Sequence, residues 1–118
     1  MTPYHALKFQ LSNLSEPDDS VENLISGKIA YIDSNCNAVT NIPVSMFEKQ
    51  GKKEFTAVVS STVRPLIVKQ YHPFYNAHEQ NVFLVYNRLG FLEITLYEGN
   101  IAALADIRVG DNITIRFT

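Results

Sequence analysis

Two polar loops are the places in this chain where side chains of suitable type and spacing could do chemistry. The first covers residues 33–41 (Asp-Ser-Asn-Cys-Asn-Ala-Val-Thr-Asn) and holds one carboxylate and three carboxamides within nine positions. Asparagine and aspartate are common in turns, because their side chains bond the local backbone and tolerate left-handed conformations. Carboxamides at the end of a strand can also read the donor and acceptor edge of a heteroaromatic ring such as adenine. The residues alone leave both interpretations open.

The second loop covers residues 86–94 (Tyr-Asn-Arg-Leu-Gly-Phe-Leu-Glu-Ile), with Gly90 at the predicted bend. A β-hairpin is the simplest interpretation of this pattern. The loop gains functional interest only together with the first loop and with two later segments, residues 99–104 (Gly-Asn-Ile-Ala-Ala-Leu) and residues 109–111 (Val-Gly-Asp).

Side chains that usually carry catalysis or metal binding are few. His5, His72 and His78 show none of the spacings of metal sites. Cys36 has no neighbouring base in the sequence that would generate a thiolate. The chain contains no nucleophile elbow, phosphate-binding glycine loop or dinucleotide fingerprint. We therefore expect this chain to hold no catalytic residue, no metal site and no cofactor.

Composition limits the class of protein further. A length of 118 residues, 46% of them hydrophobic, suits a single globular domain with its own core. With 10 basic and 12 acidic side chains, the net charge of -2 gives no basic surface for nucleic acid or an anionic membrane. No apolar run approaches the roughly 20 residues that cross a bilayer, the N-terminus lacks a secretory signal, and a single cysteine cannot form an internal disulfide. We expect a soluble, cytoplasmic protein that binds neither nucleic acid nor membranes.

The elements that would position the two loops follow a short N-terminal region. Residues 12–23 are acidic and rich in serine, which is typical of a linker, and residues 4–11 could form a short strand before it. We therefore divide the chain into an N-terminal strand and acidic linker, residues 1–25, and a β-barrel domain, residues 26–118.

Within the second region, apolar residues alternate in short segments separated by glycine and proline, which is typical of antiparallel sheets. The predicted strands cover residues 27–33, 38–43, 54–60, 65–71, 82–87, 91–97 and 112–117. A short helix is predicted at residues 44–50, between Pro43 and Gly51, and a helical turn at residues 100–105. The predicted fold is all-β, a small, mostly antiparallel β-barrel with one or two short helical turns. Its core candidates are Ile29, Tyr31, Ile42, Phe47, Phe55, Val58, Ile67, Phe83, Val85, Leu92, Ile94, Leu104, Val109, Ile113, Ile115 and Phe117.

Several motifs occur in a fixed order along the chain. Residues 27–42 read G-K-I-A-Y-I-D-S-N-C-N-A-V-T-N-I, and residues 87–95 read N-R-L-G-F-L-E-I-T. They are followed by G-N-I-A at residues 99–102 and I-R-V-G-D at residues 107–111. This order resembles the C-terminal domain of the S-adenosyl-L-methionine hydroxide adenosyltransferases, the family that includes fluorinating and chlorinating enzymes. Its patterns are G-x-[VI]-x-x-[IV]-D leading to [AL]-[VI]-T-N-I, then N-S-x-G-[YF]-L-E-I-A, G-N-A-A and [LI]-x-V-G-D.

The resemblance implies a two-domain parent enzyme. Members of the family join an N-terminal α/β domain to a C-terminal β-barrel, assemble as trimers, and bind S-adenosyl-L-methionine as substrate at a subunit interface. The family's catalytic aspartate belongs to the N-terminal domain, which these 118 residues do not contain. We therefore expect the chain alone to be inactive. The partners implied are an N-terminal catalytic domain in cis or in trans, a homotrimer, and an adenosyl ligand that the parent enzymes hydrolyse to adenosine and methionine or halogenate.

Site residues follow from the resemblance position by position. Asp33 matches the aspartate that contacts the amino group of the methionine portion, and Asn37 matches the asparagine that hydrogen-bonds adenine. The second motif adds Asn87 and Arg88 as ligand-binding positions. Arg88 stands at a serine position near the methionine end, where its charge would repel the ligand's ammonium and sulfonium groups.

Other positions depart from the family pattern around the adenine. Asn35 replaces an aromatic ring that packs on the base, and Cys36 replaces the adjacent glycine. Loss of a stacking ring costs about 1–3 kcal/mol at nucleobase sites. Phe74 or Tyr75 could supply a compensating ring. The sequence therefore leaves three interpretations: a substrate-binding and assembly domain, a non-catalytic protein-interaction or oligomerisation module with an eroded ligand site, and one subunit of a split enzyme.

Overall fold

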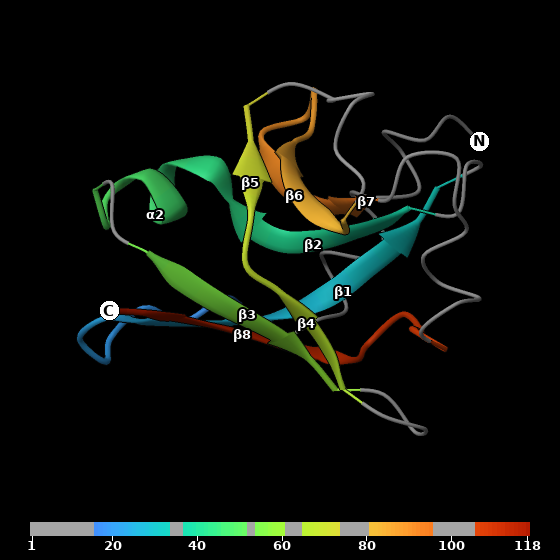
Figure 1. The fold of residues 1–118 in the computed structure, drawn as a ribbon. Coiled ribbons are helices and arrows are strands. Elements are labelled where there is room, and N and C mark those ends of the chain that lie inside the picture. Colours follow the sequence, from blue (N-terminus) through green and yellow to red (C-terminus); the bar gives the residue numbers. More distant parts are fainter. Residues whose placement is uncertain (1–15, 34–36, 52–53, 61–64, 74–80, 96–105) are drawn as a thin grey trace.

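A computed structural model of the chain describes residues 16–33, 37–51, 54–60, 65–73, 81–95 and 106–118. These residues form one strongly curled sheet of eight strands and a short helix (Figure 1). The strands are β1 (Leu24–Ile32), β2 (Ala38–Pro43), β3 (Phe55–Val59), β4 (Leu66–Val68), β5 (Tyr71–His72), β6 (Phe83–Tyr86), β7 (Phe91–Thr95) and β8 (Asn112–Phe117), and the helix is α2 (Val44–Glu48).

The order of strands in the sheet is β4-β3-β8-β1-β2-β7-β6-β5. Among the described strands all neighbours are antiparallel except β5 and β6, which are parallel. The two outermost strands, β4 and β5, are separated in the chain only by Lys69 and Gln70, so one stretch of backbone joins the two edges of the sheet (Figure 1). The backbone N–H of Leu84 also donates to the carbonyl of Gln70 at 2.9 Å. The sheet is therefore a small barrel, and the predicted all-β, mostly antiparallel fold is confirmed.

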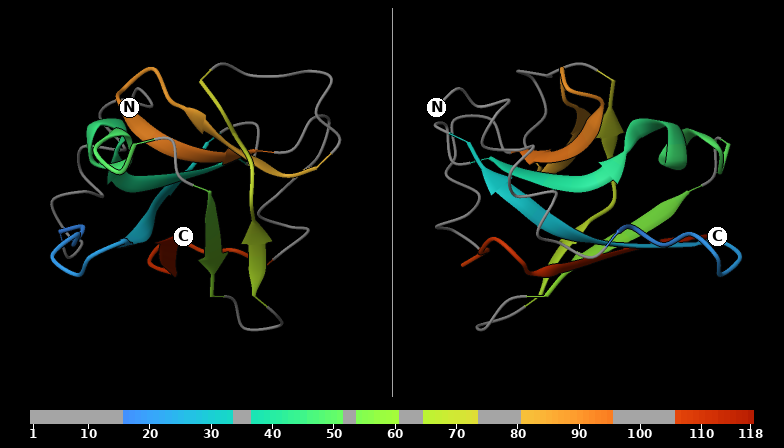
Figure 2. Two further views of the ribbon diagram at one scale, coloured as in Figure 1. Left: turned by 60° about the vertical axis from the view of Figure 1, so that its left-hand side comes forward. Right: turned by 180° about the vertical axis from the view of Figure 1, so that it is seen from behind.

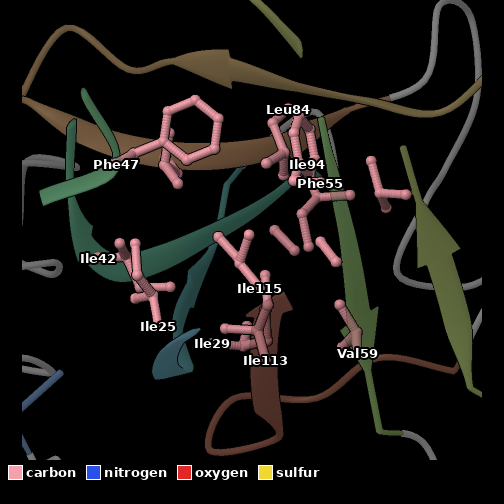
Figure 3. Close-up of a cluster of buried hydrophobic side chains, with 14 of the residues drawn as sticks. Ile25, Ile29, Ile42, Phe47, Phe55, Val59, Leu84, Ile94, Ile113 and Ile115 are labelled. Carbon is pink, nitrogen blue, oxygen red and sulfur yellow. The ribbon is translucent and has the colours of Figure 1, made fainter. Parts of the chain in front are cut away.

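The core fills the inside of this curled sheet. Successive residues of a strand point to opposite faces, so every second residue is directed inward. Fully buried isoleucines from β1, β2, β7 and β8 meet there with Leu84, Val59, Phe47 and Phe55 (Figure 3). Burial of this apolar surface is the main stabilising contribution, about 25 cal/mol for each Å² removed from water.

Two predicted core residues are exposed, and two others, Tyr31 and Val58, are only half-buried. Ile67 is 52% exposed because it lies in the middle of the edge strand β4, where the alternation directs Val68 inward and Ile67 outward. Val109 is 44% exposed because it belongs to the turn before β8 rather than to a strand. The apolar character of these side chains was therefore a poor guide to burial at a sheet edge and in a turn.

The structure also divides and extends predicted strands. The single strand predicted at residues 65–71 is two strands, because the chain changes partner from β3 to β6. β1 begins at Leu24, before the predicted start of the barrel. The predicted strand at residues 4–11, the helical turn at residues 100–105 and the core candidate Leu104 lie outside the described residues.

The predicted short helix is confirmed as α2, which lies at one end of the barrel (Figure 2). Pro43 precedes it in an extended conformation, with φ −64° and ψ 143°. Phe47 is its buried residue and packs edge-on against Phe55 and Tyr71, with ring centroids 5.3 Å and 5.2 Å away. Such edge-to-face pairs add to the burial of the rings themselves. The helix therefore covers this end of the barrel and places Phe47 in a cluster of aromatic rings.

A tight crossing at Gly27 allows β1 to serve both halves of the barrel. β1 pairs with β8 over residues 24–28 and with β2 from Ile29 onward, where the register shifts. The side chain of Asn41 in β2 reaches across, and its Oδ1 accepts a 2.8 Å hydrogen bond from the backbone N–H of Lys28. A Cβ at position 27 would lie 2.5 Å from Cγ1 of Ile42 and 2.8 Å from Oδ1 of Asn41. Only glycine fits this approach without displacing the side chains of Ile42 and Asn41.

We expect Gly27→Ala to lower the free energy of unfolding by about 1–3 kcal/mol, the usual cost of overpacking a close contact. The measurement is urea denaturation monitored by circular dichroism. The neighbouring exposed variant Ser26→Ala is the control, and its change should stay within about 0.5 kcal/mol. Equal stability of the two variants would contradict the proposed crossing constraint.

Candidate functional site

Three of the predicted site residues, Asp33, Asn37 and Asn87, lie on one surface of the barrel, which we call the outer face. It is the side of β1, β2, β7 and β6 that faces away from the main core. Strand register places one row of residues across it, Tyr31, Val39, Glu93 and Val85. Glu93 is therefore a carboxylate set among apolar neighbours on the outer face.

The turn between β1 and β2 joins Asp33 to Asn37. The backbone N–H of Asp33 donates to the carbonyl of Asn37 at 3.0 Å, and the backbone N–H of Asn37 donates to Oδ1 of Asp33 at 2.9 Å. Both residues are half-buried. The aspartate therefore has a structural role in the turn between β1 and β2.

A hydrogen bond connects this turn to the second motif. The hydroxyl of Thr95, at the end of β7, donates to Oδ1 of Asn37 at 2.9 Å. Thr95 is only 1% exposed, so the donor side of this partly buried bond is shielded from water. It joins two parts of the chain that are 58 positions apart. The carboxamide predicted to contact adenine is thereby held by a strand of the other motif.

The predicted hairpin of the second loop is confirmed, and Asn87 braces it. The backbone N–H of Asn87 donates to the carbonyl of Phe91 at 2.8 Å, and its Oδ1 accepts a 2.7 Å hydrogen bond from the N–H of Leu89. Gly90 has a φ of +89°, a conformation that favours glycine. Arg88 lies exposed at the tip of this turn. The roles of Asn87 and Arg88 as ligand contacts stay predictions.

Glu93 interacts with a side chain of each polar loop, Asn87 and Asp33. Its Oε1 accepts a 2.8 Å hydrogen bond from Nδ2 of Asn87. Burial of the carboxylate, together with the charge of Asp33, raises the pKa of Glu93, although the Asn87 hydrogen bond opposes the shift. Glu93 and Thr95 were matched to a motif in the sequence but not predicted as site residues. The available signal was their alternation with the buried Leu92 and Ile94, which places them together on the outer face.

The described groups of the outer face suit binding and orientation of a ligand. Carboxylates favour a cationic group, and carboxamides form hydrogen bonds with a heterocycle. Within residues 16–33, 37–51, 54–60, 65–73, 81–95 and 106–118, no three His, Cys, Asp or Glu side chains are gathered in a way that could hold a metal ion. Asn35, Cys36, Phe74 and Tyr75 lie outside the described residues. No helix in the described part of the chain is long and apolar enough to cross a membrane.

The family model of the SAM hydroxide adenosyltransferase C-terminal domain matches residues 27–114. No curated protein matches the chain.

Solved structures with a similar fold include an uncharacterized conserved protein from Thermotoga maritima. It has a TM-score of 0.68 and 20% identity, covering 87% of this chain and 39% of that one. A conserved hypothetical protein from Thermus thermophilus has a TM-score of 0.52 and 16% identity, covering 79% of this chain and 34% of that one. This chain therefore spans less than two fifths of the length of either protein.

The raised pKa of Glu93 predicts a specific pH dependence of stability. The charged carboxylate is disfavoured in the folded protein, so the contribution of Glu93 to the stability of wild type is lost as pH rises from the ordinary pKa of 4.5 through the raised pKa. Glu93→Gln keeps an acceptor for Asn87 and removes the charge. We expect the stability of Glu93→Gln relative to wild type to increase over this pH range, measured by urea denaturation between pH 4 and pH 7.

The control is Glu54→Gln, which removes one negative charge at an exposed position outside the outer face. It reports the general effect of a change in net charge. If both variants followed the same pH profile, burial of Glu93 would not be the cause.

Proposed function

This chain belongs to the family of SAM hydroxide adenosyltransferase C-terminal domains, and on that premise we propose that its outer face forms one half of a binding site for S-adenosyl-L-methionine and related adenosyl ligands. The observation that carries the proposal is the hydrogen bond between Thr95 and Asn37. It unites the two polar motifs into one surface, as a shared ligand would require.

The charges of the outer face favour the methionine end of such a ligand. The carboxylate of Asp33 would pair with the ammonium group, a charge-assisted interaction that is stronger than a neutral hydrogen bond. Glu93 lies close enough for its pKa to respond to Asp33, so the two acidic groups act on the same region. Arg88 is exposed, and solvent and salt would screen its repulsion of the ligand cation.

Asn37 would contact the base. Its carboxamide is half-buried and fixed at one end by Thr95, which reduces the conformational entropy lost when it binds a ligand. A purine edge offers donors and acceptors for the remaining carboxamide atoms. The outer face therefore has separate groups for the two ends of an adenosyl ligand.

Chemistry would come from a second domain. The described groups of the outer face bind and orient, and the chain covers 39% and 34% of the two structural neighbours. We propose that an N-terminal catalytic domain, in cis or in trans, completes the site within a homotrimer, and that the complete enzyme hydrolyses S-adenosyl-L-methionine to adenosine and methionine. This chain alone would bind without turnover.

Calorimetric titration of the purified chain with S-adenosyl-L-methionine and with adenosine tests the proposal. We expect saturable binding of both ligands. Asp33→Asn keeps an oxygen for the N–H of Asn37 but removes the charge. It should weaken the binding of S-adenosyl-L-methionine on the order of tenfold and leave the affinity for adenosine unchanged. Asn37→Ala should weaken the binding of both ligands. Asn112→Ala, a carboxamide change in β8, is the matched control and should affect neither.

Light scattering on the same samples measures the mass. A folded trimer that binds neither ligand would contradict the binding proposal and favour the alternative of a protein-interaction or oligomerisation module. Release of methionine or adenosine by the chain alone would contradict the proposal that catalysis needs another domain.

A further inference from the structure

We propose that Thr95 is a positioning residue that turns the NH₂ group of Asn37, rather than its oxygen, toward the ligand. The site would then select heterocycles that offer a hydrogen-bond acceptor at that place. The inference rests on the proposed function and goes beyond it by naming which chemical feature of the base is read.

The geometry at Thr95 gives the carboxamide a direction. The Thr95 hydroxyl donates to Oδ1 of Asn37 at 2.9 Å, so that oxygen faces β7. The carboxamide is planar and carries Nδ2 on its other side. Asn37 is half-buried whereas Thr95 is 1% exposed, so the hydroxyl lies on the inner side of the pair. The NH₂ group is left for a partner on the open side.

The reversed carboxamide is less favourable for a reason found at Thr95. Nδ2 would then face the hydroxyl, which would have to accept a hydrogen bond and send its own hydrogen elsewhere. Within the described part of the chain, Oδ1 of Asn37 is the hydrogen-bond partner of the Thr95 hydroxyl. A buried hydroxyl hydrogen without an acceptor costs free energy. β-branched threonine has restricted freedom at χ1, which makes it suited to holding one orientation.

The orientation has a consequence for ligand choice. Adenine presents the ring nitrogens N1, N3 and N7 as acceptors and its exocyclic amine as a donor. If the NH₂ group of Asn37 is directed at the base, it must donate to one of these three nitrogens. This holds even if Oδ1 of Asn37 also accepts a hydrogen bond from the exocyclic amine of adenine through its second lone pair. Replacement of that nitrogen by C–H leaves the Asn37 donor unpaired and should weaken binding on the order of tenfold.

The experiment compares adenosine with 1-deaza-, 3-deaza- and 7-deazaadenosine by calorimetry on the full chain. Wild type should lose about tenfold in affinity for one of these analogues. Thr95→Val has a similar shape but no hydroxyl, so its carboxamide can reverse and the discrimination should shrink. Thr95→Ser keeps the hydroxyl and should discriminate among the analogues as wild type does. Thr56→Val, which removes a hydroxyl from β3, is the matched control and should discriminate as wild type does.

The possible results separate this inference from the proposed function. If wild type binds adenosine and all three analogues equally, or if Thr95→Val discriminates as strongly as wild type, the positioning role is overturned while the binding proposal stands. If wild type binds no adenosine, the binding proposal and the selection of ligands both fail.

Nuclear magnetic resonance then still tests the orientation itself without a ligand. A strong Overhauser effect between the Asn37 side-chain NH₂ and the Thr95 hydroxyl would indicate the reversed carboxamide and overturn the inference. A weak effect, with Asn37 NH₂ resonances that shift in Thr95→Val but not in Thr56→Val, would support it.

Discussion

The close approach of β1 and β2 at Gly27 is the constraint on which the rest of the barrel depends. One strand pairs with β8 over residues 24–28 and with β2 from Ile29 onward. At Gly27, near the change of partner, side-chain atoms of Ile42 and Asn41 lie within 3 Å of where a Cβ would be. Glycine satisfies the steric requirement, and the Asn41 side chain satisfies a backbone N–H at the crossing.

The outer face follows from this crossing. Once β2 is fixed against β1, its other edge pairs with β7, and that pairing places Glu93 beside Val39. The same pairing brings Thr95 to Asn37 across 58 positions of the chain. Two loops that are each ordinary turns by themselves thereby become one polar surface. The barrel is closed elsewhere, by the continuous stretch from β4 to β5, so the outer face is formed without disturbing closure.

The outer face carries polar groups that a purely structural sheet would not need. Glu93 is partly buried beside another carboxylate, and its charged form is less stable there than in water. The carboxamides of Asn37 and Asn87 are already bonded within the protein, which orders them before any ligand arrives. The proposed binding of a cationic adenosyl ligand would use this preordered acidic and carboxamide surface.

The sequence by itself determined the local features of this protein. Alternation of apolar residues predicted most strands, Gly90 predicted the hairpin, Pro43 and Gly51 delimited the short helix, and the ordered motifs indicated the family. Each of these signals is read within a few consecutive residues. The exposure of Ile67, the division of the predicted strand at residues 65–71, and the roles of Glu93 and Thr95 were decided only by the tertiary structure. They depend on which strands become neighbours, because a local alternation shows which residues share a face but neither which face is buried nor what lies opposite it.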